Sequence, residues 1–164
     1  MKKSKKPALL GMCCAAAMIL SYVESFVSLG VPGLKIGLAN ITVVFLIYRY
    51  GWKEALSVSL VRCVLAALLF GSVMSLAYSL AGAVLSITVM TILHRLNKFN
   101  CVGVSVAGGI SHNAGQIIVA VAVTGVSEIA YYLPVLSVGG TVSGLLIGLA
   151  GAIVIERLKK VKLG

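Results

Sequence analysis

The chain has 164 residues, of which 60% are hydrophobic and only 11% charged, and its mean hydropathy is +1.09. A soluble domain this small would need a larger polar surface and would average about 25% charged residues. The net charge of +10 comes from 14 Lys and Arg against four acidic residues. Because the basic residues separate apolar stretches, the pattern indicates membrane topology and excludes nucleic acid as the partner of choice.

Six apolar stretches follow one another, separated by charged residues or by Gly and Pro. They cover residues 8–29, 36–49, 55–71, 73–93, 101–125 and 131–155. A helix needs about 20 apolar residues to cross a bilayer, so the second and third are short and are expected to tilt or to begin inside the protein. We predict an all-α integral membrane protein of six transmembrane helices, with a membrane domain at 8–155 between basic segments at 1–7 and 156–164.

The basic residues also predict the orientation. With the N-terminus inside, only Lys35 lies in an outer loop and only Arg62 lies within a helix, and all the other Lys and Arg fall in cytoplasmic segments. This excess is the positive-inside pattern. An odd number of helices would place one basic terminus outside, so both termini are expected in the cytoplasm of a bacterial cell.

Small residues repeat at helical spacing in the last and first helices. In the last helix Gly140, Gly144 and Gly148 recur every four residues, and the first helix carries Gly11 and Ala15 at the same spacing. Such spacing lets another helix approach closely. Packing within the chain and a surface for a partner subunit are both consistent with it.

Arg62 is the sharpest anomaly, because a charge inside a membrane helix costs at least about 2.5–3.5 kcal/mol and needs a partner. Glu24, in the outer part of the first helix, is the only acid within a predicted span. Arg62 is expected to pair with Glu24 or with carbonyls, to bind an anionic ligand, or to reach the cytoplasmic surface.

The fifth helix carries three polar side chains near mid-membrane, namely His112, Asn113 and Gln116. His112 and Gln116 are four residues apart and share a face, with Asn113 beside it. Polar groups at this depth must be satisfied inside the protein. A ligand or ion site is favoured over a polar helix contact.

Three further residues are candidates for the same site. Asn40, at the start of the second helix, either caps that helix or contacts a ligand. Lys35 is an interfacial anchor or a ligand contact, and Tyr78 is expected to add an amphipathic wall. The loop 30–37 is rich in Gly and is expected to close over the site.

Catalytic patterns are missing from the sequence. It has no Asp, hence no Asp-rich pair to hold Mg²⁺ against a diphosphate, and neither a Walker-type loop nor a His-Glu-x-x-His motif. We therefore expect no enzyme activity and no cofactor. Any ATP-driven process requires an ATPase on another chain.

The motifs resemble one family, the Gx transporters, labelled heptaprenyl diphosphate synthase component I. They are Glu24, Pro32-Gly-x-Lys-x-Gly-Leu-Ala-Asn40, Arg62, Tyr78-Ser-x-x-Gly82, Gly103-x-Ser-x-x-Gly-Gly-x-x-His-Asn-x-x-Gln116 and Tyr132-Leu-Pro134. The family is similar to the substrate-binding S components of energy-coupling-factor transporters. The resemblance implies a six-helix bundle, a small vitamin-like ligand near the outer face, a membrane coupling subunit and two ABC-type ATPases.

Three functions follow from these observations. The first is an S component that takes up a small anionic or amphipathic compound, with Glu24, Lys35, Asn40, Arg62, Tyr78, His112, Asn113 and Gln116 lining its cavity. The second is a non-catalytic membrane subunit associated with isoprenoid or quinone synthesis or with membrane electron transfer. The third is a proton- or ion-coupled carrier that uses Glu24 and His112.

Overall fold

The computed structural model describes residues 5–26 and 37–159, and this part of the chain contains helices and no strand. The elements are α1 (Lys5–Ser25), α2 (Asn40–Arg49), α3 (Trp52–Phe70), α4 (Val73–Arg95), α5 (Cys101–Thr124), the 3₁₀ helix η1 (Ser127–Tyr132) and α6 (Leu133–Lys159). The all-α prediction and its six α-helices are confirmed for the described residues.

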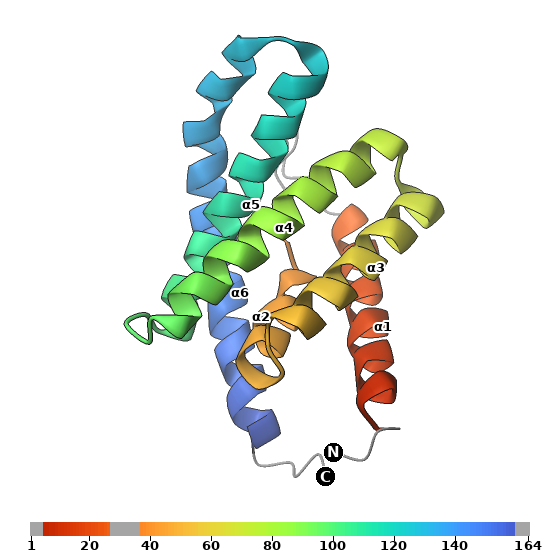
Figure 1. Ribbon diagram of the computed structural model, residues 1–164, viewed down its shortest axis with the longest axis vertical. Coiled ribbons are helices and arrows are strands. Elements are labelled where there is room, and N and C mark those ends of the chain that lie inside the picture. Colours follow the sequence, from red (N-terminus) through yellow and green to blue (C-terminus); the bar gives the residue numbers. More distant parts are fainter. Residues whose placement is uncertain (1–4, 27–36, 160–164) are drawn as a thin grey trace.

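The helices form a bundle around the short helix α2 (Figure 1). Helices α6, α5, α4, α3 and α1 pack one against the next in that order, and α5 and α6 form a long antiparallel pair. Helix α2 contacts α1, α3, α4 and α6. Its side chains Val43, Val44 and Leu46 are at most 2% exposed, so α2 forms the centre of the apolar core.

Local sequence signals set several helix ends. The Ser72 hydroxyl accepts a hydrogen bond from the Ser75 backbone N–H (3.1 Å) at the start of α4. The Asn100 side chain does the same for the Gly103 N–H (2.7 Å) at the start of α5. Such side-chain caps satisfy backbone donors that a helix start leaves free. Gly125, with φ +69°, then ends α5 in the left-handed conformation that glycine adopts easily.

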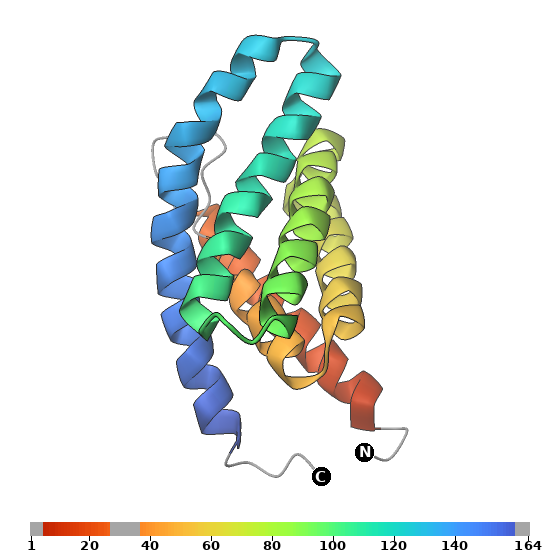
Figure 2. The ribbon, with the colours of Figure 1, turned by 60° about the vertical axis from the view of Figure 1, so that its left-hand side comes forward.

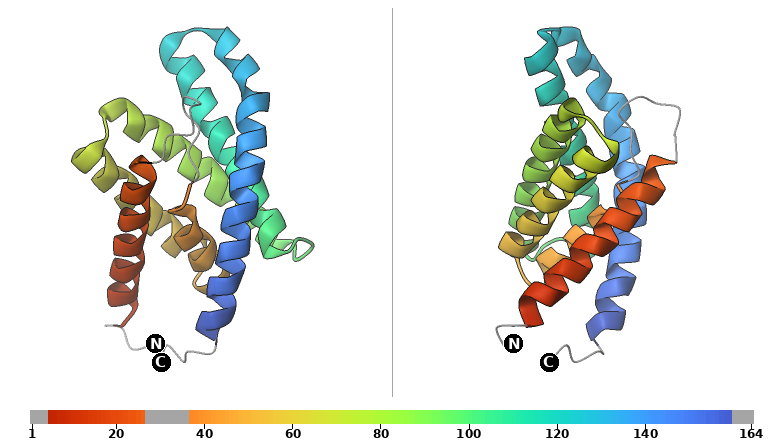
Figure 3. Two further views of the ribbon diagram at one scale, coloured as in Figure 1. Left: turned by 180° about the vertical axis from the view of Figure 1, so that it is seen from behind. Right: turned by 90° about the vertical axis from the view of Figure 1, so that its right-hand side faces the viewer.

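One end of the bundle collects the start of α1, the end of α2, the α4–α5 connection and the end of α6 (Figures 2 and 3). Basic residues concentrate there: Arg49 in the last turn of α2, Arg95 in that of α4, and Arg157 and Lys159 in that of α6. The arrangement agrees with the charge pattern of the sequence. That this end faces the cytoplasm stays a prediction.

Four helical segments are long and apolar enough to cross a membrane, namely Lys6–Ser25, Val73–Arg95, Cys101–Thr124 and Ser127–Lys159. Helix α2 has 10 residues and extends about 15 Å, half of a hydrocarbon core. Helix α3 has 19 residues but carries Lys53, Glu54 and Arg62. The number of spans therefore stays a prediction for α2 and α3.

The glycines of α6 lie inside the bundle. A Cβ atom on Gly144 would come within 2.6 Å of the Val106 Cα, and one on Gly148 within 2.7 Å of the Val102 Cα. On Gly140 it would meet the Asn113 side chain at 2.8 Å. These glycines therefore pack α6 against α5 of the same chain, which is the first of the two interpretations, and a partner surface at Gly140, Gly144 and Gly148 stays a prediction.

The small residues of α1 lie on the outside. Gly11 and Ala15 are exposed, and a Cβ atom on Gly11 would meet no atom within 4 Å. The neighbouring Met12 and Ile19 are 74% and 64% exposed. This face of α1 is therefore left open to lipid or to another subunit.

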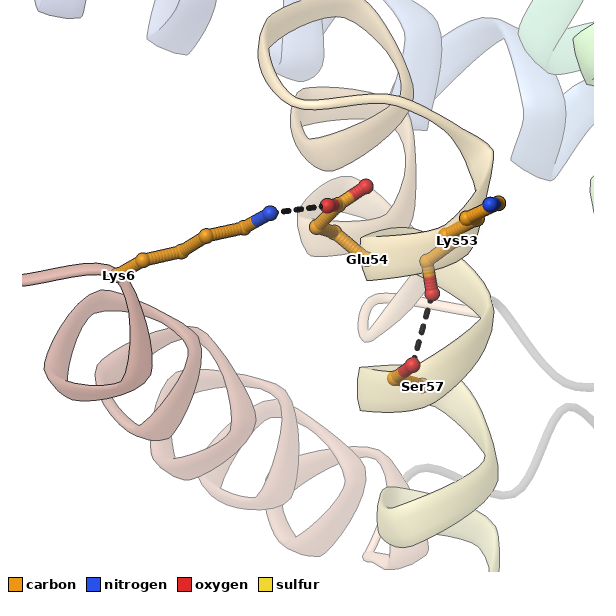
Figure 4. Close-up of polar contacts among 4 residues, drawn as sticks. All are labelled: Lys6, Lys53, Glu54 and Ser57. Atoms are coloured by element: carbon orange, nitrogen blue, oxygen red, sulfur yellow. Dashed lines mark hydrogen bonds and ion pairs between the residues drawn. The ribbon is translucent and has the colours of Figure 1, made fainter. Parts of the chain in front are cut away.

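An ion pair joins α1 to α3 near the basic end of the bundle (Figure 4). The Lys6 Nζ lies 2.5 Å from a carboxylate oxygen of Glu54, whose side chain is 15% exposed. One turn further, the Ser57 hydroxyl donates to the Lys53 carbonyl (2.8 Å). The hydrogen bond from Lys6 lowers the pKa of the Glu54 carboxyl, which precedes the apolar stretch of α3.

Removing this carboxylate should make the protein less sensitive to acid. Because the folded-state pKa of Glu54 is below its usual value of 4.5, the pair stabilises the fold above that value and is lost as the pH falls through the lowered pKa. Since the Lys6 side chain is 48% exposed, the pair is worth at most about 1 kcal/mol. We expect Glu54→Gln to lower Tm at pH 7 by about 2–4 °C and by less in acid. A Tm difference from wild type that is unchanged on acidification would contradict this account.

Candidate functional site

A cavity lies in the interior of the bundle, bounded by α1, the start of α2 and the middle of α3 to α6. It leaves about 60 Å³ for the centres of water-sized molecules, several times the space that one water needs. Its lining consists of Glu24, Gly37, Ala39, Asn40, Val44, Arg62, Ser79, Ser86, Met90, Ser105, Gly108, Gly109, His112, Asn113, Gln116, Ser143, Gly144 and Ile147. The lining thus combines polar side chains with glycines.

Most of the residues that the sequence proposed as a ligand site meet at this cavity. Glu24, Asn40, Arg62, His112, Asn113 and Gln116 all belong to its lining. Tyr78 is half-buried and lies outside the lining, whereas its neighbour Ser79 lies within it. Lys35 and most of the loop 30–37 lie outside the described residues. Ligand binding by these side chains stays a prediction.

Glu24 joins the end of α1 to the segment that begins α2. It is 9% exposed, and its Oε1 accepts a short hydrogen bond from the backbone N–H of Gly37. Gly37 has a φ of +75°, which favours glycine, and Asn40 packs back over it. The residue that caps α2 is Ala39, without a side-chain hydrogen bond, so the cap expected from Asn40 is not formed.

Arg62 lies about 15 Å along α3 from Trp52 and is half-buried. Its Nη1 donates to the Ser21 hydroxyl (3.2 Å) and its Nη2 to the Cys63 sulfur (3.5 Å). Its Nε is buried and has no hydrogen-bond partner among the described residues. The expected ion pair with Glu24 is not formed: the one ion pair within 4.0 Å in the described part of the chain is Lys6–Glu54.

His112 and Asn113 point to different neighbours of α5. The His112 ring lies over Gly82 of α4, since a Cβ atom on Gly82 would come within 2.8 Å of it. Asn113 is 5% exposed and its Nδ2 donates to the Leu136 carbonyl of α6 (2.6 Å). Asn113 therefore makes the polar helix contact that was the alternative to a ligand site, although it also borders the cavity.

Asn113→Ala should lower the stability of the protein more than Gln116→Ala does. The variant loses the hydrogen bond to α6 and leaves a small void, at a cost of about 1 kcal/mol or a Tm decrease of about 2–4 °C. The matched control is Gln116→Ala, which removes an amide one turn away on α5. Equal Tm losses in the two variants, measured on detergent-purified protein, would show that the α5–α6 bond contributes nothing specific.

Sequence reasoning did not propose three serines of the lining as site residues, namely Ser79, Ser86 and Ser143. Ser79 and Ser86 are seven residues apart on α4 with Gly82 between them, a spacing that places all three on one helix face. Ser143 of α6 lines the cavity while its hydroxyl donates to the Gly139 carbonyl (2.8 Å). A search for small polar residues at i, i+3 and i+7 would have found the face on α4.

The cavity lining has groups that can bind a small polar molecule. Its charged side chains in the described lining are Arg62 and Glu24, accompanied by amides, an imidazole and hydroxyls. Among the described residues no group of three or more His, Cys, Asp or Glu could hold a metal ion. Such a set can neutralise and orient a small polar molecule.

Together, the apolar helices indicate a multi-pass helical membrane protein, and its bundle contains a polar cavity. The chain belongs to the heptaprenyl diphosphate synthase component I family, the Gx transporters, whose family model matches residues 13–154. No curated protein and no solved structure matches the chain. The family resemblance drawn from the sequence motifs is thus confirmed.

Proposed function

We propose that the protein is the membrane-embedded substrate-binding S component of an energy-coupling-factor-type ABC importer in the bacterial cytoplasmic membrane. It takes up a small anionic or amphipathic compound, and the cavity bounded by helices α1 to α6 is the binding site. The observation that carries the proposal is Arg62, a charged side chain that lines this cavity and has no acidic partner within 4.0 Å among the described residues. A buried charge of this kind is normally matched, and here a ligand supplies the match.

The open face of α1 supports a partner subunit. Gly11 and Ala15 are exposed on the outside of the bundle, where a second helix can approach closely. A membrane coupling subunit docked there would connect the binding protein to two ABC-type ATPases. The ATPases are separate chains in this proposal because the sequence has no Walker-type loop.

The family description favours a second candidate, a non-catalytic membrane subunit of an isoprenoid synthase. Such a subunit would handle a prenyl or quinone lipid and would need a long apolar groove. The described lining has few large apolar side chains, namely Val44, Met90 and Ile147. The polar character of the cavity therefore supports the importer over this candidate.

The test is a gentle-detergent purification of the tagged protein from its native membranes, with mass spectrometry of the chains that co-purify. Recovery of a membrane subunit with two ABC ATPases is the expected result. Recovery of a prenyl synthase or redox subunits without ATPases would overturn the proposal in favour of the second candidate. Recovery of neither, with uptake that uncouplers abolish, would favour an ion-coupled carrier.

A matched pair of variants makes the test specific for α1. Gly11→Leu places a large side chain on the open face and should release the coupling subunit while the bundle stays folded. Val138→Leu, at a 67% exposed position of α6, enlarges the surface elsewhere and should leave the complex intact. Loss of the complex in both variants, or in neither, would remove α1 as the docking face.

A further inference from the structure

Two opposite charges line one cavity of this membrane bundle without neutralising each other. Glu24 is more than nine-tenths buried, and Arg62 is half-buried, yet their charged atoms are not within the 4.0 Å of an ion pair. They come from neighbouring helices, since Arg62 already contacts Ser21, one turn before Glu24 on α1. Charges buried in this way are costly unless each finds a partner.

Each charged group keeps unused bonding capacity. A carboxylate accepts several hydrogen bonds, and from the described residues Glu24 receives one, from the Gly37 N–H. A guanidinium has five N–H donors, and Arg62 gives one to a hydroxyl at 3.2 Å and one to a sulfur at 3.5 Å, while its Nε–H has no partner among the described residues. The two groups therefore present one acceptor region and one donor region to the same cavity.

The rest of the described lining favours a compact polar ligand over a large apolar one. It contains no Phe, Tyr or Trp, so it lacks the large aromatic side chains on which a flat apolar ring usually packs. Glycines and serines form much of the wall, and its large apolar side chains are Val44, Met90 and Ile147. A compact, aliphatic and polar ligand is the class that fits.

On the basis of the proposed binding function, we propose that the ligand is a small aliphatic zwitterion. Its ammonium group lies toward Glu24 and its carboxylate toward Arg62, so that the ligand bridges two charges the protein leaves apart. Asn40, His112 and Gln116 surround the two ends with hydrogen-bonding groups. Arg62 is the one basic side chain of the described lining, so within that lining it balances the single charge of a carboxylate but not the charge of about −1.5 to −2 on a phosphate.

The test measures Tm of the purified full-length protein in detergent with matched probes. The zwitterions are glycine, β-alanine and γ-aminobutyrate. Butyrate carries only the anion, propylamine only the cation, phosphoethanolamine exchanges the carboxylate for phosphate, and geranyl diphosphate represents prenyl ligands. We expect a Tm increase of about 5–10 °C with at least one zwitterion at about 100 times its Kd, and little with the other probes.

Two variants assign the ends of the ligand. Glu24→Gln keeps an oxygen for the Gly37 N–H but removes the charge, and Arg62→Gln removes the guanidinium. Both should abolish the Tm increase given by the zwitterion. The controls Glu128→Gln and Arg157→Gln change exposed charges outside the cavity and should retain it.

The zwitterion proposal would be overturned if butyrate raised Tm as much as γ-aminobutyrate does. It would also be overturned if geranyl diphosphate raised Tm, or if no zwitterion did. A zwitterion effect that persists in Glu24→Gln would do the same. These outcomes are separate from the importer proposal, which stands or falls with the co-purifying ATPases. A bound zwitterion without ATPases would keep this inference and remove the importer.

Discussion

Replacing Arg62 with alanine is expected to abolish ligand binding while the protein still inserts and folds. The guanidinium contributes two hydrogen bonds within the protein, to a hydroxyl at 3.2 Å and to a sulfur at 3.5 Å, and neither partner is charged. Its loss should therefore cost little stability. A charge-assisted hydrogen bond to a ligand is worth about 1.5–3 kcal/mol, and a bidentate contact to a carboxylate forms two of them.

The expected loss of affinity is at least about 100-fold, since each 1.4 kcal/mol is a factor of ten. It is measured as ligand retained by detergent-purified protein, with expression and Tm recorded in parallel. Arg62→Lys keeps the charge but not the planar fork, and should bind with intermediate affinity. Arg157→Ala, at an exposed position near the end of α6, is the control that should bind normally.

A variant Arg62→Ala that fails to accumulate in the membrane would reverse this interpretation. Arg62 would then act as a packing element between α1 and α3 through Ser21 and Cys63. Rescue by Arg62→Met, which keeps much of the side-chain volume without the charge, would confirm the packing role. Retention of full affinity in a folded Arg62→Ala protein would remove Arg62 from the site.

The number and order of the helices could be predicted from the sequence because apolar stretches and charged breaks report directly on the membrane. The boundaries were less accurate where charge and helix coincide. Helix α3 begins at Trp52 and includes Lys53 and Glu54 in its first turn, although these charges were expected to precede it. An acidic side chain is favourable at a helix N-terminus, so Lys53 and Glu54 belong to the first turn of α3 and do not form a break before it.

Helix α2 was predicted to begin at residue 36 and begins at Asn40. Gly37 adopts a φ of +75° and its carbonyl accepts the Asn40 N–H (2.8 Å), so the chain turns before the helix starts. The Gly-rich loop 30–37 indicated a turn, but the apolar pattern continues through it and does not mark where the helix begins. Among the described residues, the hydrogen bond from the Gly37 N–H to Glu24 also holds this turn, and Glu24 is remote in sequence.

The candidate site was predictable as a set of residues but not as a geometry. Polar side chains in apolar helices must point inward, which is why Glu24, Arg62 and His112 were found from the sequence. Which neighbour each side chain contacts depends on helix packing. The Asn113 amide donates to the Leu136 carbonyl of α6. The Glu24 carboxylate accepts from the Gly37 backbone N–H and does not pair with Arg62.

Gly144→Ala is expected to destabilise the protein, whereas the same substitution at Gly11 should stabilise it slightly. At Gly144 the added methyl group would come within 2.6 Å of the Val106 Cα and 2.9 Å of the Ser105 carbonyl oxygen. Both atoms belong to the backbone of α5, so the helices must separate. Overpacking of this kind costs about 1–3 kcal/mol, and at Gly11 only the gain in helix propensity of up to about 1 kcal/mol remains.

The two variants should therefore shift Tm in opposite directions, by about 2–4 °C for each kcal/mol, in detergent-purified protein. Gly148→Ala should follow Gly144→Ala, because its methyl group would come within 2.7 Å of the Val102 Cα. An unchanged Tm in both α6 variants, with loss of a co-purifying subunit, would show that these glycines contact a partner. A lower Tm with the complex retained would establish that they set the distance between α5 and α6, and with it the width of the cavity that Gly109 and Gly144 border.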